Sequence, residues 1–210
     1  IQKSTADWDR LEALNQYPGG GWTMSGIVST QCGIPLRAPA NVGVEGTDTT
    51  DQARPLNYVE TESYLSGATC IGEILSQQGY KNVFLGGAYT TFASKGQYLR
   101  EHGYDEVLGR EHWEQLGETE ITEAWGLSDD RLFARAKEEL AELETGNEPF
   151  MLTLLTLDTH EPAHLFDYCE ELADTPLTDA TRCSMTVVAD FIDWAEAKGY
   201  LENTAVVVVG

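Results

Sequence analysis

The sequence predicts an α/β fold in which a largely parallel sheet lies between two layers of helices. Short, continuous apolar segments, of which 150–157 is the strongest, have the length and composition of strands buried on both faces. Longer segments with apolar residues three or four positions apart lie between them, as amphipathic helices require. Strand and helix therefore alternate, which is typical of a parallel sheet with helices on both faces.

The first part of the chain predicts one helix between two irregular stretches. The segment up to residue 21 is polar and ends in Tyr17-Pro18-Gly19-Gly20-Gly21, a sequence typical of a loop. A short helix is expected at 23–31, because Gly33 and Pro35 would stop it. Residues 38–66 are rich in Thr, Asn, Gly and Asp and are expected to form a long irregular excursion.

The middle of the chain predicts two helices with a strand between them. Thr69 can cap a helix over 69–78. Its apolar face would consist of Ile71, Ile74 and Leu75. A buried strand is expected at 82–85 and a second short helix at 95–102. A glycine follows each helix and would end it.

The last third of the chain predicts two long helices and two strands. Ser128 can cap an amphipathic helix that ends at Gly146, before the strand at 150–157. Its apolar positions are Leu132, Phe133, Ala136, Leu140 and Leu143. Another helix is expected at 179–198, followed by a buried strand at 204–209. Functional residues of such sheets follow the carboxyl ends of the strands, so residues that complete the site are expected to lie beyond this last strand.

The charge of the chain excludes one class of partner. Its 35 acidic and 13 basic residues give a formal net charge of −22. Nucleic-acid binding depends on Lys and Arg displacing counterions from phosphates, so neither DNA nor RNA is an expected partner. We interpret the acidity as a solvated surface that keeps the protein soluble.

Targeting signals and cysteines bear on the compartment. No apolar run approaches the ~18 residues of a membrane span, and no signal peptide begins at Ile1, so any anchor is expected to lie outside these 210 residues. Cys32, Cys70, Cys169 and Cys183 lack the spacing of a metal site, which indicates disulfides and an oxidising compartment. Three pairings remain open, as do four buried thiols in a cytosolic protein.

Three loops carry candidate functional residues, each with a plainer interpretation beside it. Thr23 follows a glycine-rich loop and is either a nucleophile at the positive end of a helix or a simple helix cap. Lys95, after the strand at 82–85, could hold a phosphate or sulfate group, or could be a solvated lysine. His160 follows the strand at 150–157 and is either a functional group or a histidine bonded to loop backbone.

Together these loops resemble the phosphoglycerol transferases that modify osmoregulated periplasmic glucans. Those enzymes are similar to lipoteichoic acid synthases and belong to the alkaline phosphatase and sulfatase superfamily. The resemblance covers most of the chain from Gly19 onward, in family order. It rests on the segments 21–28, 31–36, 70–75, 79–80, 92–95, 102–105, 125–130, 156–162 and 203–209.

The resemblance implies a fold, a reaction and site residues. It implies an incomplete three-layer α/β sandwich, alkaline-phosphatase-like, with residues 1–210 forming one partial catalytic domain. Thr23 would be both nucleophile and metal ligand, and Lys95 and His160 would hold the phosphoglycerol group. A divalent cation, Mn²⁺ in family relatives, would activate the hydroxyl. Phosphoglycerol would move from a phosphatidylglycerol-type donor, through a covalent phospho-threonine, to a glucan.

The resemblance also implies a location and a disulfide pairing. The chain would belong to the periplasmic domain of an inner-membrane protein, with membrane contact through segments outside it. Cys32 would pair with Cys70, and Cys169 with Cys183. The remaining metal ligands would lie outside this chain, which alone is expected neither to bind the metal tightly nor to catalyse transfer.

Departures from the family pattern keep alternatives open. Many relatives have a second histidine where this chain has Glu161, which leaves acceptor or head-group contacts there undefined. A sulfatase converts Cys or Ser of a C-x-P-x-R pattern to formylglycine, but after Cys32 the Pro and Arg stand one residue too far along. A phosphoethanolamine transferase shares the fold and the threonine. A non-catalytic carbohydrate- or lipid-binding module is an alternative from another class.

Overall fold

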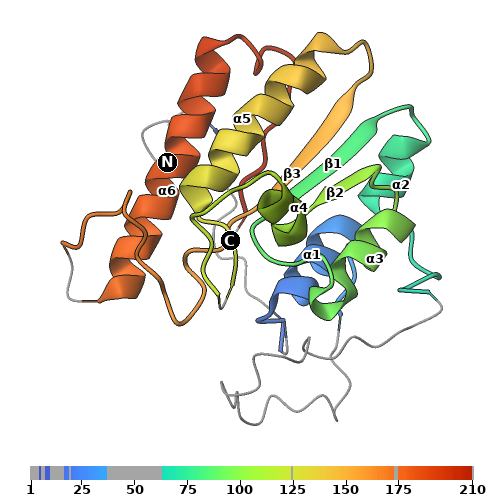
Figure 1. Cartoon of the computed structure of the whole chain (residues 1–210). Helices are drawn as coiled ribbons and strands as arrows, with labels where there is room; N and C mark the ends of the chain where they lie inside the picture. Colours follow the sequence, from blue (N-terminus) through green and yellow to red (C-terminus); the bar gives the residue numbers. More distant parts are fainter. Residues whose placement is uncertain are drawn as a thin grey trace.

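The computed structural model describes residues 5, 8–9, 17–18, 20–36, 63–123, 125–172 and 175–209. Three parallel strands form one sheet in the order β2–β1–β3, with helices on both of its faces (Figure 1). The strands are β1 (Lys81–Gly86), β2 (Glu106–Leu108) and β3 (Phe150–Leu155). The helices are α1 (Thr23–Cys32), α2 (Ile71–Ser76), the 3₁₀ turn η1 (Phe92–Ser94), α3 (Lys95–Glu101), α4 (Arg110–Gln115), α5 (Asp129–Thr145) and α6 (Pro176–Ala197). The predicted α/β class is confirmed.

Alternate side chains of β1 enter two separate hydrophobic clusters, because successive strand residues point to opposite faces. Phe84 packs in a cluster built with α1 and α3. Val83 and Leu85 pack on the other face, in a cluster built with α4 and α5. The helix α6 covers α5 through a third cluster of Phe133, Val188 and Ile192. The sheet is therefore the middle of three layers.

The strand β3 is less buried than its apolar sequence predicts. All six of its residues are partly exposed, because β3 forms one edge of the described sheet. It ends at residue 155, two residues before the predicted boundary.

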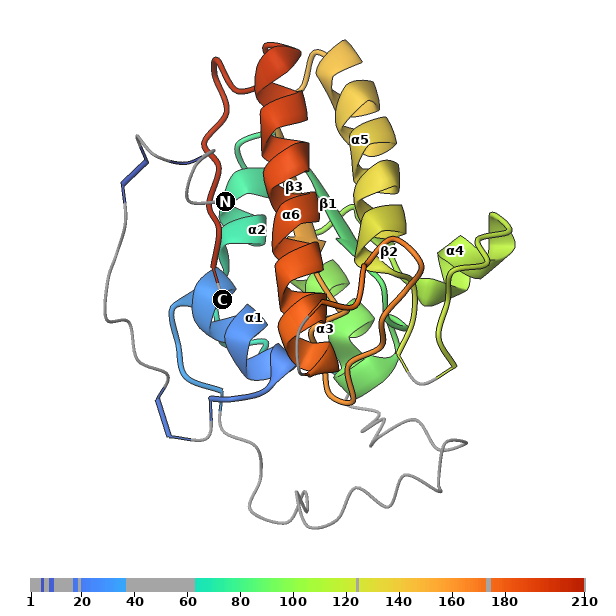
Figure 2. The same cartoon turned by 90° about the vertical axis from the view of Figure 1, so that its left-hand side faces the viewer.

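The predicted buried strand at 204–209 is wrong. This segment pairs with no described strand and runs as extended chain from the end of α6 toward α1 (Figure 2). Val207 and Val209 have 80% and 65% of their surface exposed. A strand needs a neighbour to satisfy its backbone N–H and C=O groups, so valine-rich composition does not by itself make one.

The helix α2 buries a different face from the predicted one. It spans Ile71–Ser76 rather than 69–78, and its N-cap is Cys70 instead of Thr69. Ile71 and Ile74, expected in the core, are 42% and 51% exposed. Gly72 is buried instead, since a Cβ atom there would lie 2.3 Å from the carbonyl oxygen of His102. Close contact between the backbones of Gly72 and His102, and not an apolar stripe, therefore determines how this helix packs.

The other predicted helices lie within three residues of their expected bounds. Ser128 is the N-cap residue of α5, as predicted, although its hydroxyl donates to Asp130 Oδ1 (2.7 Å) and not to a helix N–H. The helix α6 starts early because Pro176 occupies its first turn and Thr175 caps it, accepting from the Thr178 N–H. The sequence did not predict β2 or α4. No described helix is long and apolar enough to cross a membrane.

The four cysteines form two disulfides, in the pairing that the resemblance implies. Cys32 at the end of α1 is bonded to Cys70 at the N-cap of α2. Cys169 is bonded to Cys183 in α6. The interpretation of these residues as four free thiols is therefore wrong.

Candidate functional site

Thr23 is the first residue of α1 and does not cap it. The N-cap residue is Trp22, which makes no side-chain capping bond, so the interpretation of Thr23 as a simple cap is wrong. The Thr23 side chain is partly exposed, and its hydroxyl has no hydrogen-bond partner among the described residues. It also lies at the end of the helix where the backbone N–H groups give a partial positive charge. No described residue therefore occupies this hydroxyl.

Ser25, the other hydroxyl near the start of α1, is committed to the structure. It is fully buried, bonded to Tyr17 Oη, and donates to the Leu36 carbonyl oxygen (3.3 Å). Tyr17 Oη in turn donates to the same carbonyl oxygen and accepts from the Leu36 N–H. The accessible hydroxyl of the two is that of Thr23.

Lys95 is a buried cation at the end of the loop that follows β1. Only 1% of its surface is exposed, so its interpretation as a solvated lysine is wrong. Its Nζ lies 5.7 Å from the ring centre of Phe84, and it forms no ion pair with any described carboxylate. Burial lowers the pKa of Lys95 to about 8, although the charge of Glu111 acts in the opposite direction. An anion at this position would relieve the cost of an unpaired buried charge.

The backbone that delivers Lys95 is strained. The two residues before it, Ala93 and Ser94, have φ angles of +48° and +57°, a region that residues with a Cβ atom rarely adopt. Such strain persists only where the surrounding structure enforces it, and it gathers at functional sites. The fold therefore holds Ala93 and Ser94 in an unfavourable backbone conformation, and this conformation places Lys95.

His160 lies after β3 and contacts an aromatic residue that sequence reasoning left without a role. Its ring is exposed and stacks on Trp125, with ring centres 3.7 Å apart at 36°. Its Nδ1 lies 2.8 Å from the carbonyl oxygen of Glu161, so the loop-backbone interpretation is partly right, while Nε2 has no described partner. The indole Nε1 of Trp125 is buried and also lacks a described partner. The one feature of the sequence that could have indicated a role for Trp125 is the pair Trp125-Gly126, shortly before Ser128, the N-cap residue of α5.

A glycine contact fixes Trp125 beside the loop that carries Lys95. The Leu127 N–H donates to the Gly87 carbonyl oxygen (3.1 Å). Gly126 has φ +155°, and a Cβ atom there would lie 2.0 Å from that same oxygen. The segment 125–128 thus packs on the loop after β1 through its backbone and on His160 through its indole ring. The carboxyl ends of parallel strands share one edge of a sheet, so the Lys95 and His160 loops lie at the same edge.

The structure does not join the three predicted site residues by direct contact. No described hydrogen bond, ion pair or ring contact links Thr23, Lys95 and His160 to one another. What they share is that, among the described residues, the Thr23 hydroxyl, the Lys95 ammonium group and His160 Nε2 have no hydrogen-bond or ion-pair partner.

The described residues do not fit a catalytic divalent site. Such a site takes about three protein ligands, and Thr23 offers only one hydroxyl. Cys70, Glu73 and His102 place ligand atoms within 4.8 Å of one another. However, the Cys70 sulfur is bonded to Cys32, and Glu73 Oε2 accepts from the Cys70 N–H (2.9 Å) and bonds His102 Nδ1 (2.8 Å). Hydrogen bonds and a disulfide already account for this cluster.

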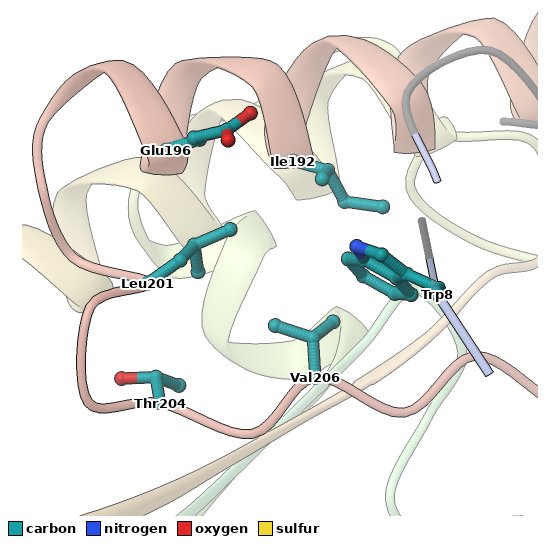
Figure 3. A pocket seen from close by; sticks show the side chains of 6 residues that line it. All are labelled: Trp8, Ile192, Glu196, Leu201, Thr204 and Val206. Carbon is teal, nitrogen blue, oxygen red and sulfur yellow. The ribbon is translucent and has the colours of Figure 1, made fainter. Parts of the chain in front are cut away.

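One hollow among the described residues is lined by none of the three site candidates. Its volume is about 320 Å³, and Figure 3 shows the side chains that surround it, contributed by α6, by the segment that follows α6 and by Trp8 near the N-terminus. They are Trp8, Ile192, Glu196, Leu201, Thr204 and Val206. A smaller hollow of about 10 Å³ is lined by Trp125, Asp158 and His160 among others. The position of the unpaired polar groups, and not the hollow's size, marks the candidate site.

Sequence comparisons relate nearly the whole chain to one group of proteins. Residues 38–210 match the sulfatase family. Phosphoglycerol transferase I of Xanthomonas euvesicatoria pv. vesicatoria (strain 85-10) is 34% identical over 203 residues, which are 93% of this chain and 27% of that protein. Phosphoglycerol transferase I of Citrobacter koseri is 31% identical over 201 residues, 92% of this chain and 25% of that protein. The chain thus spans about a quarter of the length of these relatives.

Solved structures share the fold. A protein of the alkaline phosphatase superfamily from Vibrio parahaemolyticus matches with a TM-score of 0.60 at 22% identity, over 82% of this chain and 38% of that one. The lipoteichoic acid synthase LtaP from Listeria monocytogenes matches with a TM-score of 0.55 at 18% identity, over 63% of this chain and 34% of that one. At these identities the likeness concerns the fold alone.

Proposed function

The chain belongs to the sulfatase family, and on that premise we propose that its protein transfers phosphoglycerol from a phosphatidylglycerol-type donor to a glucan in the periplasm. Residues 1–210 are, in this proposal, part of one catalytic domain. Relatives named phosphoglycerol transferase I that match almost the whole chain support this reaction class. Two disulfides support an oxidising compartment. The protein contacts the membrane through segments outside these residues.

The observation that carries the proposal is the buried charge of Lys95, for which the described part of the chain supplies no ion-pair partner. A cation that is 1% exposed and has no described carboxylate partner is costly unless a ligand brings the counter-charge. With a pKa of about 8 it remains mostly protonated at pH 7. A phosphodiester supplies one negative charge and oxygen acceptors, and so completes the site.

The proposed reaction has two displacements at phosphorus. The Thr23 oxygen attacks the phosphodiester, the bond from phosphorus to the diacylglycerol oxygen breaks, and that oxygen takes up a proton. A glucan hydroxyl then attacks the phosphoglyceryl-threonine, loses its proton, and the Thr23 oxygen regains one. Lys95 and His160 offset the charge on the non-bridging oxygens, and the start of α1 adds its partial positive charge.

A divalent metal, Mn²⁺ in the family pattern, would lower the pKa of the attacking hydroxyl. Because the described residues offer only Thr23 to such an ion, we propose that its remaining ligands come from other parts of the protein. These 210 residues alone are then expected to bind the ion too weakly for catalysis.

The disulfide pattern weakens the sulfatase alternative. Formylglycine would have to form from Cys32, but this sulfur is bonded to Cys70. A phosphoethanolamine transferase uses the same threonine chemistry, so only head-group preference separates it from the proposal.

The test uses the intact protein with phosphatidylglycerol and a periplasmic glucan. We expect phosphoglyceryl-glucan in the product mass spectrum, and a phosphoglyceryl adduct on the peptide containing Thr23 when the acceptor is withheld. Thr23→Ala should abolish transfer, and Thr23→Ser, which keeps the hydroxyl, should retain part of it. Near-normal turnover in Thr23→Ala would contradict the covalent mechanism. Faster transfer from phosphatidylethanolamine would replace the proposed donor.

A further inference from the structure

Two buried carboxyl groups lie directly behind the His160 loop. Asp129, the first residue of α5, is fully buried, and Asp158, just after β3, is 6% exposed. Neither forms an ion pair with a described Lys, Arg or His. Burying two acids side by side without a cation is costly, so their place in the fold calls for a reason.

The two residues hold each other's backbone. Asp129 Oδ1 accepts from the Leu157 N–H (2.7 Å), and Asp129 Oδ2 from the Asp158 N–H (3.4 Å). In return, Asp158 Oδ2 accepts from the Asp129 N–H (3.1 Å) at the start of α5. These bonds clamp the exit of β3 onto the first turn of α5.

Hydroxyl groups from two further segments complete the cluster. Ser184 of α6 donates to Asp129 Oδ2 (2.6 Å), and Tyr168 donates to Asp158 Oδ2 (2.5 Å). Burial raises the pKa of both acids, that of Asp158 to about 7. The charge of Asp129 adds to the effect at Asp158, and the charge of Asp130 adds to it at both. The cluster therefore keeps a proton up to near-neutral pH, which limits the negative charge next to a phosphate site.

His160 depends on the same clamp from two directions. Its N–H donates to the Leu157 carbonyl oxygen (2.9 Å), so it belongs to the turn whose N–H groups Asp129 holds. Its ring stacks on Trp125, four residues before Asp129 in the segment that leads into α5. Moving α5 relative to the exit of β3 would shift the backbone of His160 and the ring surface beneath it in different directions.

We propose that Asp129 and Asp158 are positioning residues that hold His160 in place for the substrate's phosphoryl group. This inference rests on the proposed role of His160 and extends it to residues that touch no substrate. It predicts that Asp129 acts on the ligand only through His160.

A double-mutant cycle in the intact protein tests this dependence. Binding of glycerol 1-phosphate is measured for the unmodified protein, Asp129→Ala, His160→Ala and the double variant. We expect about a tenfold loss in each single variant and no more than about twofold further loss when Asp129→Ala is added to His160→Ala. Asp190→Asn, an exposed acid of α6, is the matched control and should leave the affinity unchanged. Additive losses would overturn the proposal.

Amide hydrogen exchange gives a second readout that does not depend on activity. In Asp129→Ala the amides of residues 157 and 158 should exchange at least tenfold faster. Asp129→Asn, which keeps an oxygen acceptor, should be intermediate, and Ser184→Ala offers a milder change if Asp129→Ala does not fold. Unchanged exchange in all three would overturn the clamp. If the unmodified protein does not bind glycerol 1-phosphate, the proposed function fails, while the exchange rates still decide whether Asp129 holds this loop.

Discussion

At the scale of single residues, the sequence pointed to Thr23, Lys95 and His160 but could not describe their surroundings. A lysine in a very acidic chain was most simply a solvated one, yet Lys95 is buried over Phe84. Its burial comes from the packing of α3 on the sheet, which no local pattern encodes. Trp125 was missed as a site residue because its contact with His160 joins segments 35 residues apart.

Replacing Lys95 by methionine should stabilise the fold and remove the anion site. The folded-state pKa is depressed from 10.5 to about 8, so the charged form costs roughly 3 kcal/mol of the free energy of unfolding at pH 7. For the unmodified protein this free energy should therefore rise between pH 8 and pH 10.5, because the unfolded chain binds the extra proton there. Lys95→Met should be more stable at pH 7 and lack that rise in urea titrations.

Lys95→Met should also change two functional quantities, the rate of phosphoglycerol transfer and the affinity for glycerol 1-phosphate. Both should fall at least tenfold in Lys95→Met, and in the unmodified protein the affinity should decline as the pH passes about 8. The exposed Lys198, at the end of α6, supplies the control, since Lys198→Met removes the same charge without touching the site. A destabilised Lys95→Met variant that still binds the anion would contradict this account.

At the scale of elements, the sequence predicted the helices and strands that have a clear local periodicity. It failed where contacts with distant segments determine whether an element forms or which face it buries. The helix α5 and the strand β3 were predicted because their apolar spacing and Ser128 are local signals. The strand β2 has only three residues, too short to show a period. The segment 204–209 has the composition of a strand but no described partner strand. The helix α2 buries Gly72, because its close contact with the His102 backbone leaves no room for a side chain.

Gly126 gives an element-scale prediction about the segment that supports His160. Gly126→Ala should destabilise the protein by about 3 kcal/mol or more, because the new methyl group would lie 2.0 Å from the Gly87 carbonyl oxygen. Gly117 also has a positive φ, +82°, but open space around it, so Gly117→Ala should cost only about 1 kcal/mol. Thermal unfolding of both variants separates steric contact from backbone strain. Equal losses of stability in the two variants would mean that the contact between Gly126 and the Gly87 carbonyl oxygen adds nothing to the effect of the positive φ.

At the scale of the whole molecule, each of the two disulfides should contribute a few kcal/mol to the free energy of unfolding. The Cys32–Cys70 bond closes 38 residues and the Cys169–Cys183 bond 14, which corresponds to about 4 and 3 kcal/mol in the chain-entropy model. Replacing both partners by serine, one pair at a time, should lower the free energy of unfolding by these amounts in denaturant titrations.

The two pairs should differ in their effect on transfer. Cys32 anchors the end of the helix that begins with Thr23, so Cys32→Ser/Cys70→Ser should also reduce transfer in the intact protein under conditions where it stays folded. The Cys169→Ser/Cys183→Ser variant serves as the comparison and should reduce transfer less. The reverse order would indicate that α1 is held by its packing alone.

The strand order β2–β1–β3 has a consequence for how the chain reaches its fold. The central strand pairs with β2 across 23 positions of sequence (83 and 106) but with β3 across 69 (81 and 150). Local pairing is entropically cheaper, so β1 and β2 can meet early, whereas the second edge of β1 waits for a distant segment. Until β3 arrives, the apolar residues Val83, Phe84 and Leu85 sit in a strand with an open edge, the kind of edge that pairs with other chains. The same arrangement that places the loops after β1 and β3 side by side therefore leaves an apolar strand edge open in the partly folded chain until β3 pairs with it.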